Sequence, residues 1–314
     1  MQQFLTGYGF SGPAARATVL EGGCDNLNLL LVIGDEQLVL RRYRFTRADE
    51  IAWELELIRF LAEHGFPTPP VLTRMDGGLA GSFLGGTTAL FRYLPGEESD
   101  PRSKDHAVQT AVMIADLHLV TQGLEFRHPR RRTDFQRLAD LEAIASRLDS
   151  PGLAEMAAEA VAFRDSFIAR LAAGPAIPWG IVHHDPNPGN VLVDREGKVV
   201  ALLDFDEAHS SHLLTDVAGT IRYWATRPEG FSLDTEWAAL QAAAYHTRRP
   251  LSAWEWSLLP DFLEFIYLAD AAEYVTGALR SDPTRPAVEE CWSYRRYRAL
   301  REEEAWRERI AGVR

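Results

Sequence analysis

The feature that most constrains this chain is a short polar loop placed between two apolar runs. Residues 181–194 read IVHHDPNPGNVLVD, so His, Asp and Asn side chains lie between segments typical of buried strands. Pro186, Pro188 and Gly189 are incompatible with a helix through the middle, because proline lacks an amide N–H and glycine disfavours helical backbone. We therefore expect a stiff loop that presents polar side chains at the end of a strand.

A second apolar run follows at once and ends in acidic residues. Residues 199–206 read VVALLDFD, and residues 195–198 between the two runs have the composition of a turn. Two short strands joined by such a turn form a hairpin. This hairpin would bring Asn190, before the first strand, close to Asp204, after the second.

These residue types are suited to phosphoryl transfer. Asp185 on the stiff loop could accept a proton from a substrate hydroxyl. Asn190 and Asp204 offer amide and carboxylate oxygens, the hard ligands that Mg²⁺ prefers alongside nucleotide phosphates. One base and two metal ligands are the parts of kinase-type catalysis, in which positioning and charge neutralisation dominate.

The adjacent histidines suggest an alternative metal chemistry. A hydrolase with a zinc ion could be built on His183, His184 and Asp185. Adjacent residues of a strand point to opposite faces, however, so His183 and His184 would not readily bind one metal ion. We keep the hydrolase as an alternative enzyme class.

The composition of the chain limits the classes of binding partner and the cellular location that we expect. The chain has 314 residues and a net charge of −12, which disfavours a general nucleic-acid binder. No run of about 20 apolar residues is present, so we expect no membrane partner. Only two cysteines occur, which fits a reducing, cytoplasmic location better than a disulfide framework. We expect a monomer or homodimer acting on a small molecule.

The order of predicted elements indicates an α+β fold with two lobes. Strands are expected at 17–21, 27–33, 37–44 and 88–94, with a helix at 48–64. Long helices follow residue 103, and capping boxes are predicted at Thr133–Gln136 and Ser252–Glu255. We expect a small β-rich lobe over 1–95 and a larger, mostly helical lobe over 96–314, with a ligand cleft between them.

The loop and the acidic run together resemble the aminoglycoside phosphotransferase family, which includes choline kinases and type II homoserine kinases. The family's His-x-Asp-x-x-x-x-Asn loop matches His183, Asp185 and Asn190, and its metal motif matches 204–206. The pairs Leu117-His118 and Asp216-Val217-Ala218 fit further family positions. The resemblance implies a protein-kinase-like fold that uses ATP and Mg²⁺.

The resemblance also implies roles for the loop residues. Asp185 would be the catalytic base, Asn190 and Asp204 would hold Mg²⁺, and His183 would support the loop without reacting.

In the first lobe, the resemblance implies a phosphate-binding cation paired with a helix glutamate. Arg41 stands where the family usually has lysine, with Arg42 as an alternative, and Glu54 takes the glutamate position. The loop at 22–28, including Gly23 and Asn26, would cover the phosphates. The segment Arg92, Tyr93 and Leu94 would meet adenine as a hinge.

The sequence says less about which molecule accepts the phosphoryl group. An amino alcohol such as homoserine fits the homoserine-kinase-like branch, while 186–189 resembles the antibiotic kinases and suggests an aminoglycoside-type acceptor as the alternative. Asp206 and Glu207 could face the amine of either. Because Arg41 replaces lysine, a nucleotide-binding pseudokinase without turnover is a further alternative.

Overall fold

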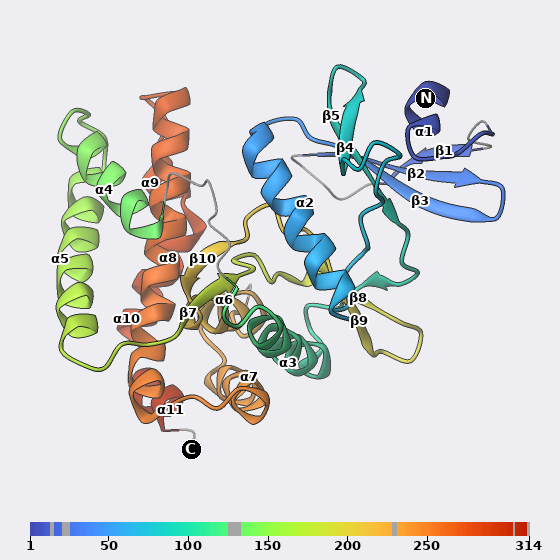
Figure 1. The fold of residues 1–314 in the computed structure, drawn as a ribbon. Helices are drawn as coiled ribbons and strands as arrows, with labels where there is room; N and C mark the ends of the chain where they lie inside the picture. The colour runs from blue at the N-terminus through green and yellow to red at the C-terminus, as the bar shows by residue number, and fades with distance from the viewer. Residues whose placement is uncertain (13–15, 21–25, 125–132, 228–230, 304, 313–314) are drawn as a thin grey trace.

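The computed structural model describes residues 1–12, 16–20, 26–124, 133–227, 231–303 and 305–312. A short helix, α1 (Gln2–Thr6), precedes an antiparallel sheet of five strands in the order β1-β2-β3-β5-β4. The strands are β1 (Arg16–Val19), β2 (Leu27–Ile33), β3 (Glu36–Arg42), β4 (Ala80–Phe83) and β5 (Gly86–Arg92). Helix α2 (Ala48–Glu63) lies between β3 and β4 in the chain, as Figure 1 shows.

The sheet is covered on both faces, which follows from the alternation of its side chains. Leu31, Leu38, Leu40 and Leu90 form a small core with Phe4 and Leu5 of α1. Ala89 and Phe91 point to the other face and join the main core that α2 shares. Strand residues of one parity therefore face α1 and those of the other face α2.

Most of the remaining chain is helical. The helices are α3 (Lys104–Val120), α4 (Asp134–Ala145), α5 (Leu153–Ala172), α6 (Leu214–Trp224), α7 (Thr235–Arg248), α8 (Ala253–Ser281), α9 (Ala287–Glu290), α10 (Trp292–Glu302) and α11 (Trp306–Ala311). The long helix α8 is central and packs against α4, α6 and α10. Both predicted capping boxes are present, at the starts of α4 and α8.

Short strands carry the polar loop into this helical region. β7 (Trp179–Val182) pairs with β10 (His209–His212), and β6 (Glu97–Glu98), β8 (Val191–Val193) and β9 (Val199–Leu202) form a second small sheet. The 3₁₀ turn η1 (Pro188–Asn190) leads directly into β8. The β8–β9 hairpin confirms the predicted pairing around 195–198.

Some element boundaries differ from the predictions. The strand expected at 17–21 is β1 at Arg16–Val19, and the strand expected at 88–94 ends at Arg92. Tyr93 and Leu94 follow the end of β5, and the amide of Tyr93 still donates to the carbonyl of Gln37 in β3 at 3.2 Å. Over the described residues, no helix is both long and apolar enough to cross a membrane.

Candidate active site

A buried aspartate holds the polar loop in place. Asp216, at the start of α6, is fully buried and accepts hydrogen bonds from the backbone amides of His183 and His184, both at 2.7 Å. His118 of α3 adds a third contact, with Nε2 at 3.1 Å from Asp216 Oδ2. Burial opposes the carboxylate charge, but His118 and the donors around it keep the pKa of Asp216 below its usual value. One carboxylate thereby joins the loop to two helices.

His183 connects the loop to the following hairpin. Its Nε2 donates to the carbonyl oxygen of Leu203 at 2.8 Å, and its Nδ1 accepts from the amide of Asp185 at 3.3 Å. Both ring nitrogens are therefore used in structural contacts, and the buried ring packs edge-on against Phe205. This geometry suits a side chain that positions Asp185 and Asp204.

Asp185 is oriented by two asparagines. Its Oδ2 accepts from Asn187 Nδ2 at 2.8 Å and from Asn190 Nδ2 at 2.9 Å. Asn190 Nδ2 also donates to the backbone carbonyl of Asp185 at 3.0 Å. These two acceptors fix the orientation of the Asn190 amide, so its Oδ1 is the atom left to bind a cation.

The hairpin brings the two expected metal ligands to one end of the loop. The amide of Leu203 donates to the carbonyl of Asn190 at 2.8 Å, which places Asp204 one residue from that contact. Asp204 has a φ of 62°, a left-handed conformation that is uncommon outside glycine. Strained backbone of this kind is often found at functional sites.

Arg41 joins the sheet to Asp204, one of the two expected metal ligands. Its Nη1 lies 3.2 Å from Glu54 Oε1 and 2.9 Å from Asp204 Oδ1, and its Nε donates to Asn28 at 3.3 Å. The structure thus pairs Arg41 with Glu54 and leaves Arg42 on the opposite side of β3. Burial works against the Arg41 charge, yet the surrounding acids, led by Asp204, keep the pKa of Arg41 above its usual value.

Glu54 is buried within this network and is costly to ionise. Burial, together with the Asp204 charge, raises its pKa to about 7, although Arg41 acts in the opposite direction. When folding raises the pKa of a carboxyl group, the group contributes its full stabilisation at pH values below its pKa in the unfolded chain. That contribution is lost as the pH rises through the folded value.

We therefore expect Glu54→Gln to remove a pH-dependent part of the stability. Between pH 5 and pH 8 the free energy of unfolding of the wild type should fall, relative to the variant, by about 2 kcal/mol. Urea unfolding at the two pH values measures this difference. Glu56→Gln, on the exposed face of the same helix, is the matched control. Parallel pH profiles for wild type and Glu54→Gln would contradict the account.

A pocket of about 310 Å³ lies between the sheet and the hairpin. Its walls include Val39, Arg41 and Phe91 from the sheet and Asn190 and Asp204 from the loop and hairpin. The segment Arg92, Tyr93 and Leu94 lines the same pocket. The pocket thus has an apolar part, formed by Val39 and Phe91, and a charged part, formed by Arg41 and Asp204.

Three further residues were predicted to bind the nucleotide, and the structure describes the surroundings of two of them. The guanidinium of Arg92 turns outward to Glu36, at 3.2 Å, so only its backbone is suited to a hinge contact. Asn26 is buried, and its Oδ1 has no hydrogen-bond partner among the described residues. Gly23 lies outside the described residues.

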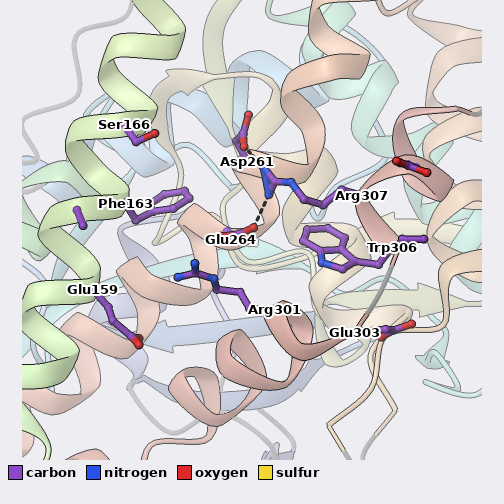
Figure 2. A pocket seen from close by; sticks show the side chains of 12 residues that line it. Glu159, Phe163, Ser166, Asp261, Glu264, Arg301, Glu303, Trp306 and Arg307 are labelled. Carbon is purple, nitrogen blue, oxygen red and sulfur yellow. Dashed lines mark hydrogen bonds and ion pairs between the residues drawn. The ribbon is translucent and has the colours of Figure 1, made fainter.

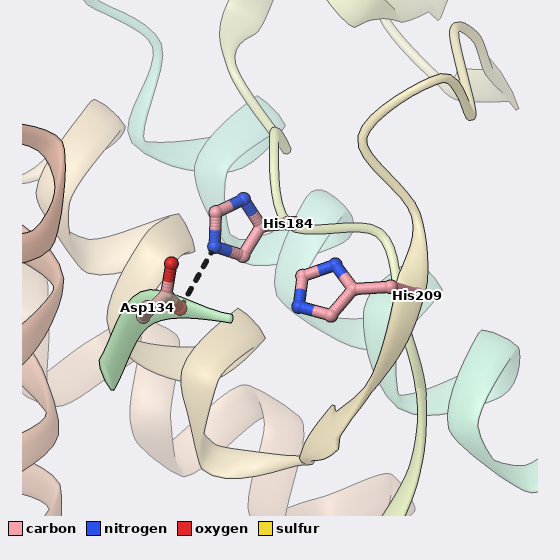
Figure 3. Close-up of side chains that lie close together, drawn as sticks. All are labelled: Asp134, His184 and His209. Carbon is pink, nitrogen blue, oxygen red and sulfur yellow. Dashed lines mark hydrogen bonds and ion pairs between the residues drawn. The ribbon is translucent and has the colours of Figure 1, made fainter. Parts of the chain in front are cut away.

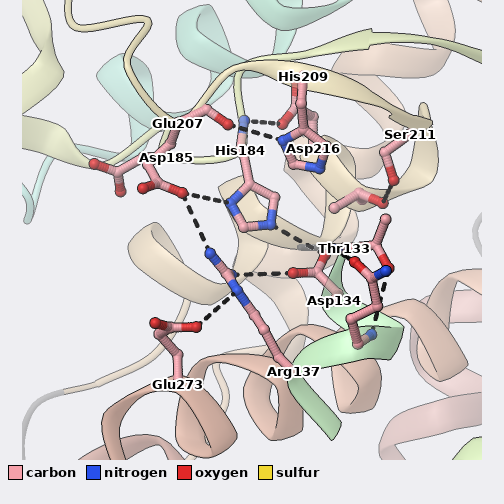
Figure 4. Close-up of polar contacts among 12 residues, drawn as sticks. Thr133, Asp134, Arg137, His184, Asp185, Glu207, His209, Ser211, Asp216 and Glu273 are labelled. Atoms are coloured by element: carbon pink, nitrogen blue, oxygen red, sulfur yellow. Dashed lines mark hydrogen bonds and ion pairs between the residues drawn. The ribbon is translucent and has the colours of Figure 1, made fainter. Parts of the chain in front are cut away.

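Asp206 and Glu207, expected to face an acceptor amine, have different surroundings. Burial and the charges of Asp204 and Glu54 raise the pKa of Asp206 to about 8. Glu207 lies 3.4 Å from Arg137 and 3.8 Å from His184 Nδ1, as Figure 4 shows. Asp206 is therefore grouped with Asp204 and Glu54, while Glu207 belongs to a separate polar network.

That network contains a group that resembles a metal site. Asp134, His184 and His209 offer ligand atoms within 4.8 Å of one another (Figure 3). Asp134 already accepts from His184 Nε2 at 3.1 Å and from Arg137 at 3.0 Å. The Arg137 cation occupies the carboxylate and would repel a metal ion. His183 and His184 point apart, which also argues against the zinc hydrolase.

A larger pocket, of about 830 Å³, lies away from the loop (Figure 2). It is lined by α5, α8 and the C-terminal helices, and Arg307 pairs with Asp261 and Glu264 inside it. None of the residues expected to act on a nucleotide lines it. We therefore do not assign the reaction to this pocket.

Several residues around the loop were missed at the level of sequence. Tyr223 of α6 lies beside Asp185, which together with burial raises the tyrosine pKa. Asp134 and Arg137 of α4 reach the loop through His184 and Glu207. These residues lie outside 181–206, and although Asp134 falls within the predicted capping box, no sequence signal indicates their contacts with the loop.

The geometry is that of a phosphotransferase, and sequence comparison agrees. The sequence model of the phosphotransferase enzyme family matches residues 16–254, so the chain belongs to this family of small-molecule kinases. The predicted family and the α+β, two-lobed kinase-like fold are thereby confirmed.

Individual relatives are similar over most of their length. A homoserine kinase of Caulobacter sp. (strain K31) is 29% identical over 262 residues, which are 82% of this chain and 79% of that protein. Among solved structures, a microcompartment-associated aminopropanol kinase is 21% identical with a TM-score of 0.68, covering 100% of this chain and 98% of its own. An aminoglycoside phosphotransferase from Alicyclobacillus acidocaldarius is 17% identical with a TM-score of 0.66, covering 99% and 94%.

Proposed function

We propose that this protein transfers the γ-phosphoryl group of ATP, with Mg²⁺, to a hydroxyl of a small amino alcohol such as homoserine. The observation that carries the proposal is the convergence of Arg41, Asn190 and Asp204 on one pocket whose loop also presents Asp185. The homoserine kinases among the relatives support the acceptor class.

Each residue has a defined part in this proposal. Asn190 Oδ1 and the Asp204 carboxylate would hold Mg²⁺, which when bound neutralises charge on the phosphates. Arg41, fixed by Glu54, supplies a second positive charge at the phosphate end of the pocket. Asp185, held by Asn187 and Asn190, takes the proton from the acceptor hydroxyl.

The same residues suggest which part of the reaction each lobe serves. We propose that residues 1–95 bind the nucleotide, with the backbone of 92–94 meeting adenine. Residues 96–314 would carry the base, the metal ligands and the acceptor site. Asn26 and the neighbouring loop would cover the phosphates.

The arginine at position 41, where the family usually has lysine, is the reason for the pseudokinase alternative. Arginine keeps the positive charge, and its pair with Glu54 at 3.2 Å reproduces the expected link between sheet and helix. A guanidinium can also contact a phosphate through two N–H groups. The replacement of lysine is therefore compatible with turnover.

A panel of acceptors tests the proposal. ADP formation from Mg·ATP should be stimulated by L-homoserine or a related amino alcohol and abolished by EDTA. Aminoglycosides as the preferred acceptors would transfer the assignment to the antibiotic kinases. Nucleotide binding without ADP formation for any acceptor would support the pseudokinase and overturn the proposal.

A further inference from the structure

Two arginine side chains are buried behind the catalytic loop. Arg222, in the last turn of α6, is 7% exposed, and Arg296 of α10 is 1% exposed. The guanidinium of Arg222 lies 5.9 Å from the ring centre of Tyr267, and the charge of Arg296 acts on the same tyrosine. Two cations are thus gathered around one buried ring.

The described residues supply too little negative charge for this pair. Arg222 lies 2.7 Å from Asp270, and Arg296 donates one hydrogen bond, to the carbonyl of Arg227 at 2.8 Å. The Nε of Arg222 and the Nε and Nη1 of Arg296 are buried without an acceptor among the described residues. Burial of a guanidinium without a counter-ion is costly, so the arrangement is that of an incomplete ion pair.

The electrostatics of Arg296 agree with this geometry. Burial, with the nearby charge of Arg222 acting in the same direction, lowers the pKa of Arg296 to about 10. A bound anion would relieve both the burial cost and the repulsion between the two guanidinium groups.

The pair lies next to the reacting end of the proposed site. Trp224 Nε1 donates to the carbonyl of Pro186 at 3.0 Å, which packs the end of α6 against the catalytic loop. Arg222 Nη1 donates to the hydroxyl of Tyr223 at 3.3 Å, and Tyr223 lies beside Asp185. The Tyr223 hydroxyl therefore lies between Arg222 and the catalytic base.

The phosphates of ATP do not account for the missing anion. The nucleotide pocket is lined by Arg41, Asn190 and Asp204, whereas neither Arg222 nor Arg296 lines it. The anion must approach from the acceptor side of Asp185. The Asp270 side chain, 41% exposed, shows that the ion pair reaches solvent on one side.

We propose that Arg222 and Arg296 bind the carboxylate of the acceptor, which makes the substrate a hydroxy amino acid and not a simple amino alcohol. This inference rests on the proposed function and deepens it. A carboxylate matches the planar guanidinium fork. Asp270, beside Arg222, would then face the ammonium group of the same zwitterion.

A matched pair of acceptors tests the inference in the wild type. L-Homoserine and 3-amino-1-propanol differ only by the carboxylate. We expect kcat/KM to be at least about 100-fold higher for L-homoserine, because without a carboxylate Arg296 has no counter-ion and Arg222 has only Asp270. Equal use of the two acceptors, or a preference for the alcohol without a carboxylate or for a phosphate-bearing alcohol, would overturn the proposal.

Substitutions test whether the arginine pair causes the preference for an acceptor with a carboxylate. Arg296→Gln should raise the KM for L-homoserine about 100-fold and change the KM for 3-amino-1-propanol, which has no carboxylate, far less. Arg296→Lys should restore part of the affinity. Arg298→Gln, on the exposed face of α10 and paired with Glu155, is the matched control. An Arg296→Gln variant that keeps the wild-type preference for the carboxylate would refute the assignment.

A binding measurement separates this inference from the proposed function. Calorimetric titration of the wild type with each acceptor, in the presence of Mg·AMP-PNP, requires no turnover. Tighter binding of L-homoserine supports the carboxylate site even if no ADP forms, an outcome that would reject only the kinase proposal. Equal affinities would reject the carboxylate site while ADP formation upheld the kinase.

Discussion

Replacing Asp185 by Asn should reduce kcat by about 1,000-fold or more while leaving the KM for ATP nearly unchanged. The asparagine can still accept hydrogen bonds from Asn187 and Asn190, so the loop keeps its position. It cannot take a proton from the acceptor hydroxyl, and removal of a general base typically costs about 100-fold to 10,000-fold in rate. Steady-state ADP release with saturating acceptor measures the effect.

The control for this substitution is an aspartate with no part in the site. Asp165 on α5 is exposed and pairs with Arg164 at 3.0 Å, so Asp165→Asn should retain wild-type kcat. Wild-type kcat in Asp185→Asn would show that Asp185 is not the base. A large rise in the KM for ATP would instead indicate that the substitution disturbs the nucleotide pocket.

Replacing Asp216 by Asn should cause the largest loss of stability in the chain's polar network, about 3–5 kcal/mol. The fully buried carboxylate accepts from two loop amides and from His118. An asparagine would direct its own NH₂ group at one of these donors and leave it unpaired. We also expect kcat to fall by about 100-fold, because the loop that carries Asp185 would lose its fixed position.

Urea unfolding and steady-state kinetics of the same Asp216→Asn preparation check both effects. Asp194 is a suitable comparison, since its carboxylate also accepts two backbone amides, from Glu196 and Lys198, but in a more accessible hairpin turn. Asp194→Asn should cost about 1 kcal/mol and leave kcat unchanged. Equal destabilisation by the two substitutions would contradict the role given to Asp216.

Much of the fold could be predicted because local rules and tertiary packing agree. The capping boxes at Thr133 and Ser252 form as their sequences indicate, since each satisfies helix N–H groups with nearby side chains. The hairpin at 195–198 also forms, because its turn and its apolar strands point to the same pairing. Strand ends were predicted less accurately, as at β5, which ends at Arg92 and not at Leu94.

From residue spacing alone, the site could be predicted only where its residues are close in sequence, and Arg41 and Glu54 came from the family resemblance. Asp185, Asn190 and Asp204 lie within one loop and hairpin, so their approach follows from local structure. Arg222 and Arg296 approach the same ring, that of Tyr267, because α6 and α10 both pack against α8. No periodicity or spacing encodes that arrangement, and an isolated arginine in a helix is expected to be a surface residue.

Phosphorus NMR of a complete reaction tests the central claim most directly. With Mg·ATP and L-homoserine, the account predicts a new phosphomonoester signal that grows in step with ADP, and neither signal when the acceptor is omitted. Two results would contradict the assignment of this protein as a kinase that phosphorylates a small-molecule hydroxyl. One is release of ADP with inorganic phosphate as the sole other product, and the other is ADP formation at the same rate with and without the acceptor.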